Sequence, residues 1–278
     1  MWLPRLRMGH VALSAQHVTV AESVPFRVGK LMSCENLQLP QVVDGQARET
    51  QAWQPAVTAL SNWLADKGDR LASVHVVLSG RFVRWQLLPW RPELAGAQER
   101  AAYATLCFQD TFGKLAQGWQ VLQSLQPPGR AVPACAVDTA LMQALGAACS
   151  SAGIHLASVK PYFASAMDRW QSSLRGGTVW FGVVEPDSLT LGLLQQGRWL
   201  GLQSQRISGD WRDLVPGLMA QMGIACGLPG AVSVSTIPLY LVGTGDVPSQ
   251  QRGLAFIWLQ PKTVIGKPSG HARMAMGV

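Results

Sequence analysis

Charged side chains are scarce in this sequence. Asp, Glu, Lys and Arg make up 14% of the 278 residues, against about 25% in a typical soluble domain. Hydrophobic residues make up 48%, which excludes a mainly disordered chain because such a composition can bury a sizeable core. The sequence also contains eleven Trp. So much apolar surface predicts a folded protein that works in an assembly.

The cysteines lack the spacing of disulfide or metal sites. Five are present, an odd number, and none forms a CxxC pair. This pattern argues against a disulfide framework and a zinc site, and it predicts a reducing, cytoplasmic location. The first 16 residues contain Pro4 and several charges without an unbroken apolar run, so they do not indicate a secretory signal peptide.

A long uncharged segment does not predict a membrane span. Residues 214–245 contain no charged side chain, but Pro216, Pro229, Pro238 and several glycines interrupt them. The uninterrupted pieces fall short of the ~20 residues that a spanning helix needs. We predict a buried helix, a loop and a buried strand.

The net charge of +7 comes mainly from the two ends of the chain. Residues 1–21 and 247–278 carry Arg and Lys but no acid. A nucleic-acid binder would gather its cations on one folded face with interleaved aromatics, so we expect no nucleic-acid partner. Basic ends fit an anionic membrane surface or an acidic partner, and solvated tails that keep the protein soluble explain them equally well.

The motifs of common enzyme classes are missing. The sequence contains no GxxxxGK[ST], GxGxxG, GxSxG or HExxH, and its histidines do not pair at the spacing of metal ligands on a helix. His75 and His155 fall inside strand patterns and are interpreted as structural. Glu185 and Asp187 are the two carboxylates that lie close together in the sequence. They fall in a predicted turn, where we expect them to be solvated.

Hydrophobic periodicity predicts an α/β protein in which meanders of strands alternate with helices. Residues 189–205, LTLGLLQQGRWLGLQSQ, alternate apolar and small or polar residues around a Gln-Gln-Gly-Arg centre and predict a hairpin. Asp210 is expected to cap a helix, and Gly153 to take a positive φ where another ends. The expected strands are 10–14, 17–23, 35–40, 73–80, 81–89, 118–125, 178–184, 189–194, 198–207 and 237–246. The expected helices are 50–68, 93–113, 162–174 and 211–223, and residues 131–161 are expected to form a strand, helix and strand.

Three stretches carry a resemblance to a known family. They are SVHVVLSGRFVRWQLLPW (73–90), similar to a strand pair that ends in Leu-Pro before a helix, VDTALMQALGAACSSAGIHLASVKPYFASAMDRW (137–170), and LTLGLLQQGRWLGLQSQRI (189–207). Their order resembles the PilM and GspL cytoplasmic-domain family of type IV pilus and type II secretion assembly proteins, over most of residues 9–245.

The resemblance implies an actin-like (ribonuclease-H-like) duplicated two-lobe fold with an inserted small α/β subdomain. The implied division is residues 1–72 for part of the first lobe, 73–160 for the inserted subdomain and the return to the core, 161–260 for the second lobe, and 261–278 for a basic, flexible tail.

In the wider actin-like fold, two hairpins carry Asp-x-Gly pieces that hold Mg²⁺ and cradle phosphates. Neither hairpin shows that pattern here, although Ser14, Glu185 and Asp187 lie nearby in the sequence. Gly243 and Gly245 are either remnants of the adenosine side of such a pocket or an ordinary turn after a strand. We expect these five residues to form a remnant nucleotide pocket, with no catalytic residue, metal or cofactor; bound ATP with magnesium is the alternative.

The function that the resemblance implies is a non-catalytic scaffold of a pilus or secretion machine, cytoplasmic and peripheral at the inner membrane. Its implied partners are a membrane-anchored PilN-like protein and the motor ATPase. Arg84, Trp85, Trp90 and Arg91 are candidates for a partner surface because Trp and Arg are enriched at binding hot spots; otherwise one Trp belongs to the core and the arginines line a strand face. The alternative function is a nucleotide-binding actin-like ATPase or phosphotransferase with degenerate phosphate motifs.

Overall fold

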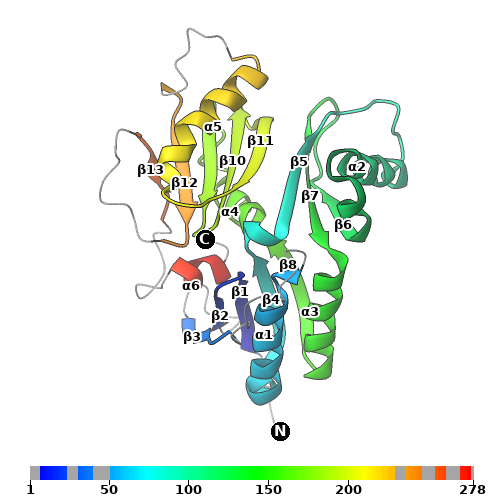
Figure 1. Cartoon of the computed structure of the whole chain (residues 1–278), viewed down its shortest axis with the longest axis vertical. Coiled ribbons are helices and arrows are strands. Elements are labelled where there is room, and N and C mark those ends of the chain that lie inside the picture. Colours follow the sequence, from blue (N-terminus) through cyan, green and yellow to red (C-terminus); the bar gives the residue numbers. More distant parts are fainter. Residues whose placement is uncertain are drawn as a thin grey trace. The chain divides into compact units, whose positions relative to one another are not determined.

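The computed structural model in Figure 1 describes residues 7–23, 31–39, 51–228, 236–245, 254–260 and 270–276. The chain divides into two compact units. The first comprises Met1–Phe82, Thr139–Ser165 and Gln260–Val278, and the second comprises Val83–Asp138 and Ala166–Leu259. The lobe boundaries expected at residues 72, 160 and 260 stay predictions. The two units are defined by contacts in the folded chain, whereas the expected lobes are defined by a resemblance between sequences.

A five-stranded sheet forms the centre of the first unit, in the order β3-β2-β1-β4-β8. Its strands are β1 (Arg7–Leu13), β2 (Val18–Ser23), β3 (Leu31–Leu37), β4 (Leu71–Leu78) and β8 (His155–Pro161). Strands β1, β2 and β3 form an antiparallel meander, whereas β4 runs parallel to both β1 and β8. The predicted opening meander is therefore confirmed.

Three helices of the described residues lie wholly within the first unit. They are α1 (Gln54–Lys67), α3 (Thr139–Ser151) and α6 (Gly270–Ala275), and a 3-10 turn, η2 (Gly68–Arg70), follows α1. Leu60 and Leu64 are buried in α1, four residues apart as an amphipathic helix requires. Helix α6 lies within the segment expected to be a flexible tail, where its small residues and Met274 are buried.

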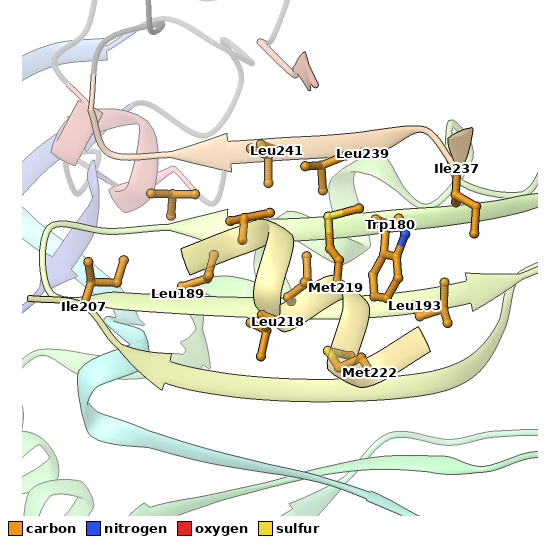
Figure 2. Close-up of a cluster of buried hydrophobic side chains, with 13 residues drawn as sticks. Trp180, Leu189, Leu193, Ile207, Leu218, Met219, Met222, Ile237, Leu239 and Leu241 are labelled. Atoms are coloured by element: carbon orange, nitrogen blue, oxygen red, sulfur yellow. The ribbon is translucent and has the colours of Figure 1, made fainter. Parts of the chain in front are cut away.

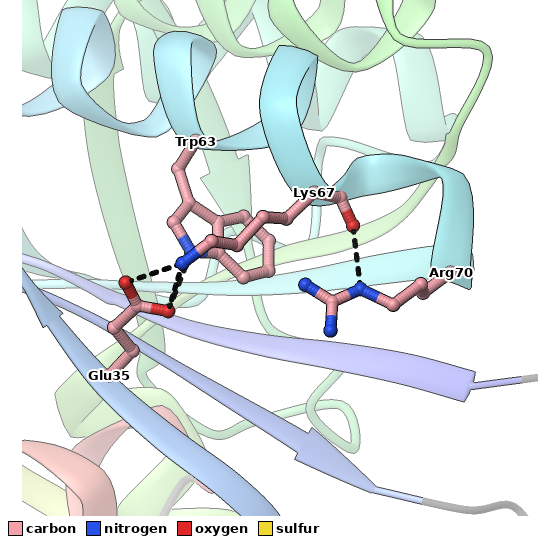
Figure 3. Close-up of polar contacts among 4 residues, drawn as sticks. All are labelled: Glu35, Trp63, Lys67 and Arg70. Carbon is pink, nitrogen blue, oxygen red and sulfur yellow. Dashed lines mark hydrogen bonds and ion pairs between the residues drawn. The ribbon is translucent and has the colours of Figure 1, made fainter.

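Strand β3 is tied to α1 by a carboxylate at the edge of the sheet (Figure 3). The side chain of Glu35 accepts hydrogen bonds from Lys67 Nζ at 2.9 and 3.0 Å and from Trp63 Nε1 at 3.1 Å. These partners lower the pKa of Glu35, with the Lys67 hydrogen bond contributing most. Within the described residues β3 is an edge strand that pairs with β2, and the contact with α1 helps to hold it in place.

The second unit contains a sheet with the same plan. Its order is β11-β10-β9-β12-β13, with strands β9 (Thr178–Val184), β10 (Ser188–Gln195), β11 (Arg198–Arg206), β12 (Leu239–Gly243) and β13 (Ile257–Trp258). The first three are antiparallel, and β12 is parallel to β9 and β13. Each strand thus has a counterpart in the first sheet, which is the duplication that the sequence predicted.

The predicted hairpin is β10–β11. Its turn residues Gln196 and Gly197 have φ angles of 51° and 72°, as in the type I′ turn that suits the twist of a hairpin. Helix α5 (Trp211–Ala225) begins at Asp210, whose carboxylate accepts a hydrogen bond from Arg212 N at 3.0 Å. The predicted N-cap is therefore confirmed.

Helix α5 lies on this sheet and closes an apolar core (Figure 2). The core consists of side chains from the sheet, α5 and the adjoining loops. They are Trp180, Val184, Leu189, Leu191, Leu193, Ile207, Val215, Leu218, Met219, Met222, Ile237, Leu239 and Leu241. The uncharged segment at 214–245 thus supplies a buried helix and a buried strand, as expected, and residues 229–235 within it lie outside the described ranges.

A third, three-stranded sheet has the order β5-β7-β6. Its strands are β5 (Val83–Leu88), β7 (Val132–Asp138) and β6 (Trp119–Gln123), and the remaining elements are η3 (Gly80–Phe82), α2 (Ala97–Phe112), η4 (Gly113–Gly118) and α4 (Tyr162–Trp170). One expectation is corrected here: β4 and β5 do not form a strand pair. Strand β4 lies between β1 and β8, while β5 pairs with β7, because η3 intervenes and the chain passes from one sheet to another.

No helix among the described residues is both long enough and apolar enough to cross a membrane.

Candidate functional site

The turn between β1 and β2 is closed by its own hydrogen bonds. Ser14 N donates to His17 O at 2.9 Å. The Ser14 hydroxyl accepts a hydrogen bond from His17 N at 2.9 Å and donates one to His17 O at 2.8 Å. Both the amide and the hydroxyl of Ser14 are therefore engaged within the turn.

The turn between β9 and β10 repeats this geometry with different side chains. Glu185 N donates to Ser188 O at 2.9 Å, as Ser14 N does to His17 O. Ser188 Oγ donates to Glu185 Oε2 at 3.0 Å, and Glu185 is only 5% exposed. Asp187 is partly exposed, and its carbonyl accepts a hydrogen bond from Ile207 N at 3.0 Å.

A hydroxyl residue follows the parallel neighbour strand in each sheet. Ser79 N donates to Leu13 O at 2.9 Å, and Thr244 N donates to Val184 O at 3.2 Å. Ser79 and Thr244 are both buried, and Thr244 Oγ1 has no hydrogen-bond partner among the described residues. Sequence reasoning did not single out either residue, because a Ser or Thr after a strand is too common to signal a site.

The two candidate glycines differ in their surroundings. A Cβ atom added to Gly243 would lie 2.7 Å from Val184 O and 2.7 Å from the Trp258 ring, whereas one added to Gly245 would meet nothing within 4 Å. Gly243 is thus required by close packing between strands. Gly245 is exposed at the end of the described segment.

The structure brings four of the five expected pocket residues to one end of the second sheet, after the last residues of β9 and β12. Glu185 and Asp187 share a turn, and Gly243 is opposite Val184 in the β9–β12 register, so that Gly245 follows close by. Ser14 holds the position equivalent to Glu185 in the other unit. These are the carboxyl ends of parallel strands, where α/β proteins commonly bind ligands.

The described groups match a magnesium–triphosphate site poorly. Such a site needs backbone amides free to bind phosphate and carboxylate oxygens grouped around the metal. Here the amides of Ser14 and Glu185 are hydrogen bonded within their turns, and the Glu185 carboxylate is buried against Ser188. Within the described ranges, no group of three or more His, Cys, Asp or Glu side chains could hold a metal ion.

Two histidines form a stacked pair on the first sheet. The rings of His10 and His75 lie 5.5 Å apart between centroids at an angle of 15°. His10 Nε2 is 2.9 Å from Ser23 Oγ, and His75 Nδ1 is 2.9 Å from Ser158 Oγ. Burial lowers the pKa of His10 to about 4, and the charge of His75 adds to the effect. The structural role expected for His75 fits this arrangement.

The residues expected to form a partner surface lie on and after β5. Because side chains alternate along a strand, Arg84 and Trp85 point to opposite faces of the sheet. Trp90 is 42% exposed. Arg91 lies over the Tyr103 ring, 6.0 Å from its centroid, and its Nε donates to Tyr103 Oη at 3.4 Å. Whether these residues bind a partner stays a prediction.

No known protein-family model matches this sequence, and no curated protein does either. Several solved structures share the fold. A PilM–PilN type IV pilus biogenesis complex matches with a TM-score of 0.59 at 14% identity, over 99% of this chain and 98% of that one. The cytoplasmic domain of EpsL, an inner-membrane component of the type II secretion system of Vibrio cholerae, matches with a TM-score of 0.57 at 11% identity, over 97% and 92% of the two chains.

A Bacteroides thetaiotaomicron protein of unknown function with an actin-like ATPase fold matches with a TM-score of 0.57 at 11% identity, over 88% of this chain and 84% of that one. With the repeated strand order of the two sheets, these similarities define the class: this protein has an actin-like, two-lobe α/β fold. At such low identity the similarity establishes the fold and leaves function to be argued separately.

Proposed function

We propose that this protein is a non-catalytic scaffold in the assembly platform of a type IV pilus or type II secretion machine. The observation that carries the proposal is the pair of equivalent turns, in which the amides of Ser14 and Glu185 are consumed by internal hydrogen bonds. Amides that are already hydrogen bonded within their turns are less available to phosphate oxygens, which favours protein binding over phosphoryl transfer. The near-complete coverage of a PilM–PilN complex and of EpsL supports the same function.

The partners we propose are a membrane-anchored PilN-like protein and the motor ATPase of the same machine. An extended segment of such a partner would be held by backbone pairing at a sheet edge together with apolar pockets. The protein would lie in the cytoplasm at the inner membrane, with its basic ends near anionic lipid. Most of those basic residues lie outside the described ranges, but Arg7 and Arg273 lie within them, and Arg7 is paired with Glu22 at 2.8 Å.

The direct test measures partner binding. A fluorescent peptide that corresponds to the N-terminal cytoplasmic segment of a PilN-like membrane protein from the same genome is titrated with the full chain and followed by anisotropy. Saturable binding, absent for a scrambled peptide, is expected. If neither this peptide nor the intact PilN-like protein binds, the scaffold proposal is overturned.

A second test addresses the alternative function. A ligand that binds only the folded state stabilises it by about 2.7 kcal/mol when present at 100 times its dissociation constant, so nucleotide binding would raise the melting temperature by several degrees. We expect no shift with millimolar ATP and magnesium. A reproducible shift that Asp187→Asn abolishes would favour an ATPase or phosphotransferase.

A further inference from the structure

Helix α6 packs against strands β1, β2 and β4 of the first sheet. Its residues Ala272, Met274 and Ala275 are buried. The helix has only six residues, which is too short to be stable by itself in water. Its helical form therefore depends on packing, and a change that weakens this packing should release the helix as a unit.

The polar contact of α6 with the sheet is made by two histidines. The ring centroids of His271 in α6 and His17 in the β1–β2 turn lie 4.4 Å apart, with 34° between the planes. His17 is exposed, whereas Nε2 of His271 is buried and has no hydrogen-bond partner among the described residues. A neutral ring can occupy this position at modest cost. A proton on it would place a charge in a buried position that has no hydrogen-bond acceptor among the described residues.

Within the described residues of α6 and the strands it contacts, no acid is available to compensate a charge on His271. Burial, and then the neighbouring His17 ring, lower the pKa of His271. The titratable side chains of β1, β2, β4 and α6 besides His271 are Arg7, His10, Glu22, His75 and Arg273. Glu22 is the single acid among them, and it is held by Arg7 at 2.8 Å. None of the others carries a negative charge that could offset a proton on His271.

We propose that α6 is a pH-sensitive cover of the first hairpin, released when acidification places a proton on His271 beside His17. The released state exposes the surfaces of β1, β2 and β4 that α6 covers. This inference does not depend on the scaffold function, because it concerns one contact within the first unit.

The direction of the effect follows from proton linkage. The docked helix holds His271 neutral, while the released helix takes up a proton at the ordinary histidine pKa of about 6.5. Docking is therefore at full strength above that pH and weakens as the pH falls below it. At pH 5.5 a single such histidine shifts the ratio of docked to released helix by up to about tenfold.

The test is hydrogen–deuterium exchange of the full chain at pH 7.5 and 5.5, with rates corrected for the intrinsic effect of pH. Protection of the α6 amides should fall several-fold between the two conditions in the wild type. In His271→Phe, which keeps an aromatic ring and cannot titrate, protection should fall much less between the two conditions than in the wild type. His155→Gln changes an exposed histidine of the same sheet and should behave as the wild type.

Two outcomes would overturn the proposal: α6 protection that does not change with pH in the wild type, or an equal change in His271→Phe. Amides of β1 and β4, followed in the same experiment, separate release of α6 from general loosening of the sheet. If His271→Phe does not fold, His17→Gln replaces it. That variant removes the second ring and should reduce the pH dependence, and an unchanged dependence would count against the proposal.

Discussion

Ser14 and Glu185 occupy equivalent positions in two sheets of the same strand order, and the amide of each donates to the carbonyl three residues further along, at 2.9 Å in both turns. One side chain is a short hydroxyl and the other a buried carboxylate. The duplicated backbone has thus been preserved while the chemistry of its two turns has diverged. Function in this protein is better sought in its surfaces than in a symmetric nucleotide site.

The two glycines after β12 provide a matched pair of variants. Gly243→Ala should destabilise the protein by about 1–3 kcal/mol, because the new methyl group collides with Val184 O and the Trp258 ring. Gly245→Ala should change stability by less than about 0.5 kcal/mol, since its added Cβ meets nothing within 4 Å. Urea unfolding followed by Trp fluorescence distinguishes them. Equal effects would show that Gly243 is not required by packing.

Ser188→Ala should lower the free energy of unfolding, because the buried carboxylate of Glu185 loses a hydrogen-bond donor. Without the hydroxyl that donates to Glu185 Oε2 at 3.0 Å, we expect a loss of about 1–2 kcal/mol, because a buried acceptor loses a partner. Ser172→Ala, at an exposed position of the same unit, serves as the control and should have little effect. A neutral Ser188→Ala would mean that Glu185 is fully satisfied by its other contacts.

Glu35→Gln should weaken the attachment of β3 to α1 only slightly. The Lys67–Glu35 ion pair is well exposed, at 35% and 45% for the two side chains, and such pairs contribute about 0.2–1 kcal/mol. Because the pKa of Glu35 is lowered, its contribution is present above the ordinary carboxyl pKa and is lost as the pH falls through the lowered value. The variant should lack that part of the pH dependence.

The measurement for Glu35 is urea unfolding at neutral and acid pH, compared with Asp66→Asn, which changes an exposed carboxylate on α1 itself. Hydrogen exchange of the β3 amides should rise in Glu35→Gln and stay unchanged in the control. Unaltered β3 exchange would indicate that strand pairing alone fixes this edge.

Much of the fold could be predicted from sequence, because the information was local. Period-2 alternation located the meanders and the β10–β11 hairpin, and Asp210 located the start of α5. The pairing of β4 and β5 was predicted wrongly, because the residues of two successive strands do not indicate whether the strands belong to the same sheet. Contacts such as Glu35 with Trp63, and His17 with His271, join distant segments and depend on the folded backbone, so no sequence spacing could reveal them.

His10 should make the first unit sensitive to acid. Its pKa is lowered to about 4 by burial and by His75, so the folded state resists protonation that the unfolded chain accepts. Stability is therefore complete above about pH 6.5 and decreases down to about pH 4, with a loss of about 2 kcal/mol between pH 7 and 5. Urea unfolding of wild type and His10→Gln at these two pH values measures it. A slope that is equal in both proteins would exclude His10 as its source.

The buried hydroxyl of Thr244, which has no hydrogen-bond partner among the described residues, lowers the stability of the folded protein. Valine has nearly the same shape as threonine and lacks the hydroxyl. Thr244→Val should therefore raise the melting temperature. If orthologous chains nonetheless keep a hydroxyl residue at this position, selection acts there on a property other than thermal stability.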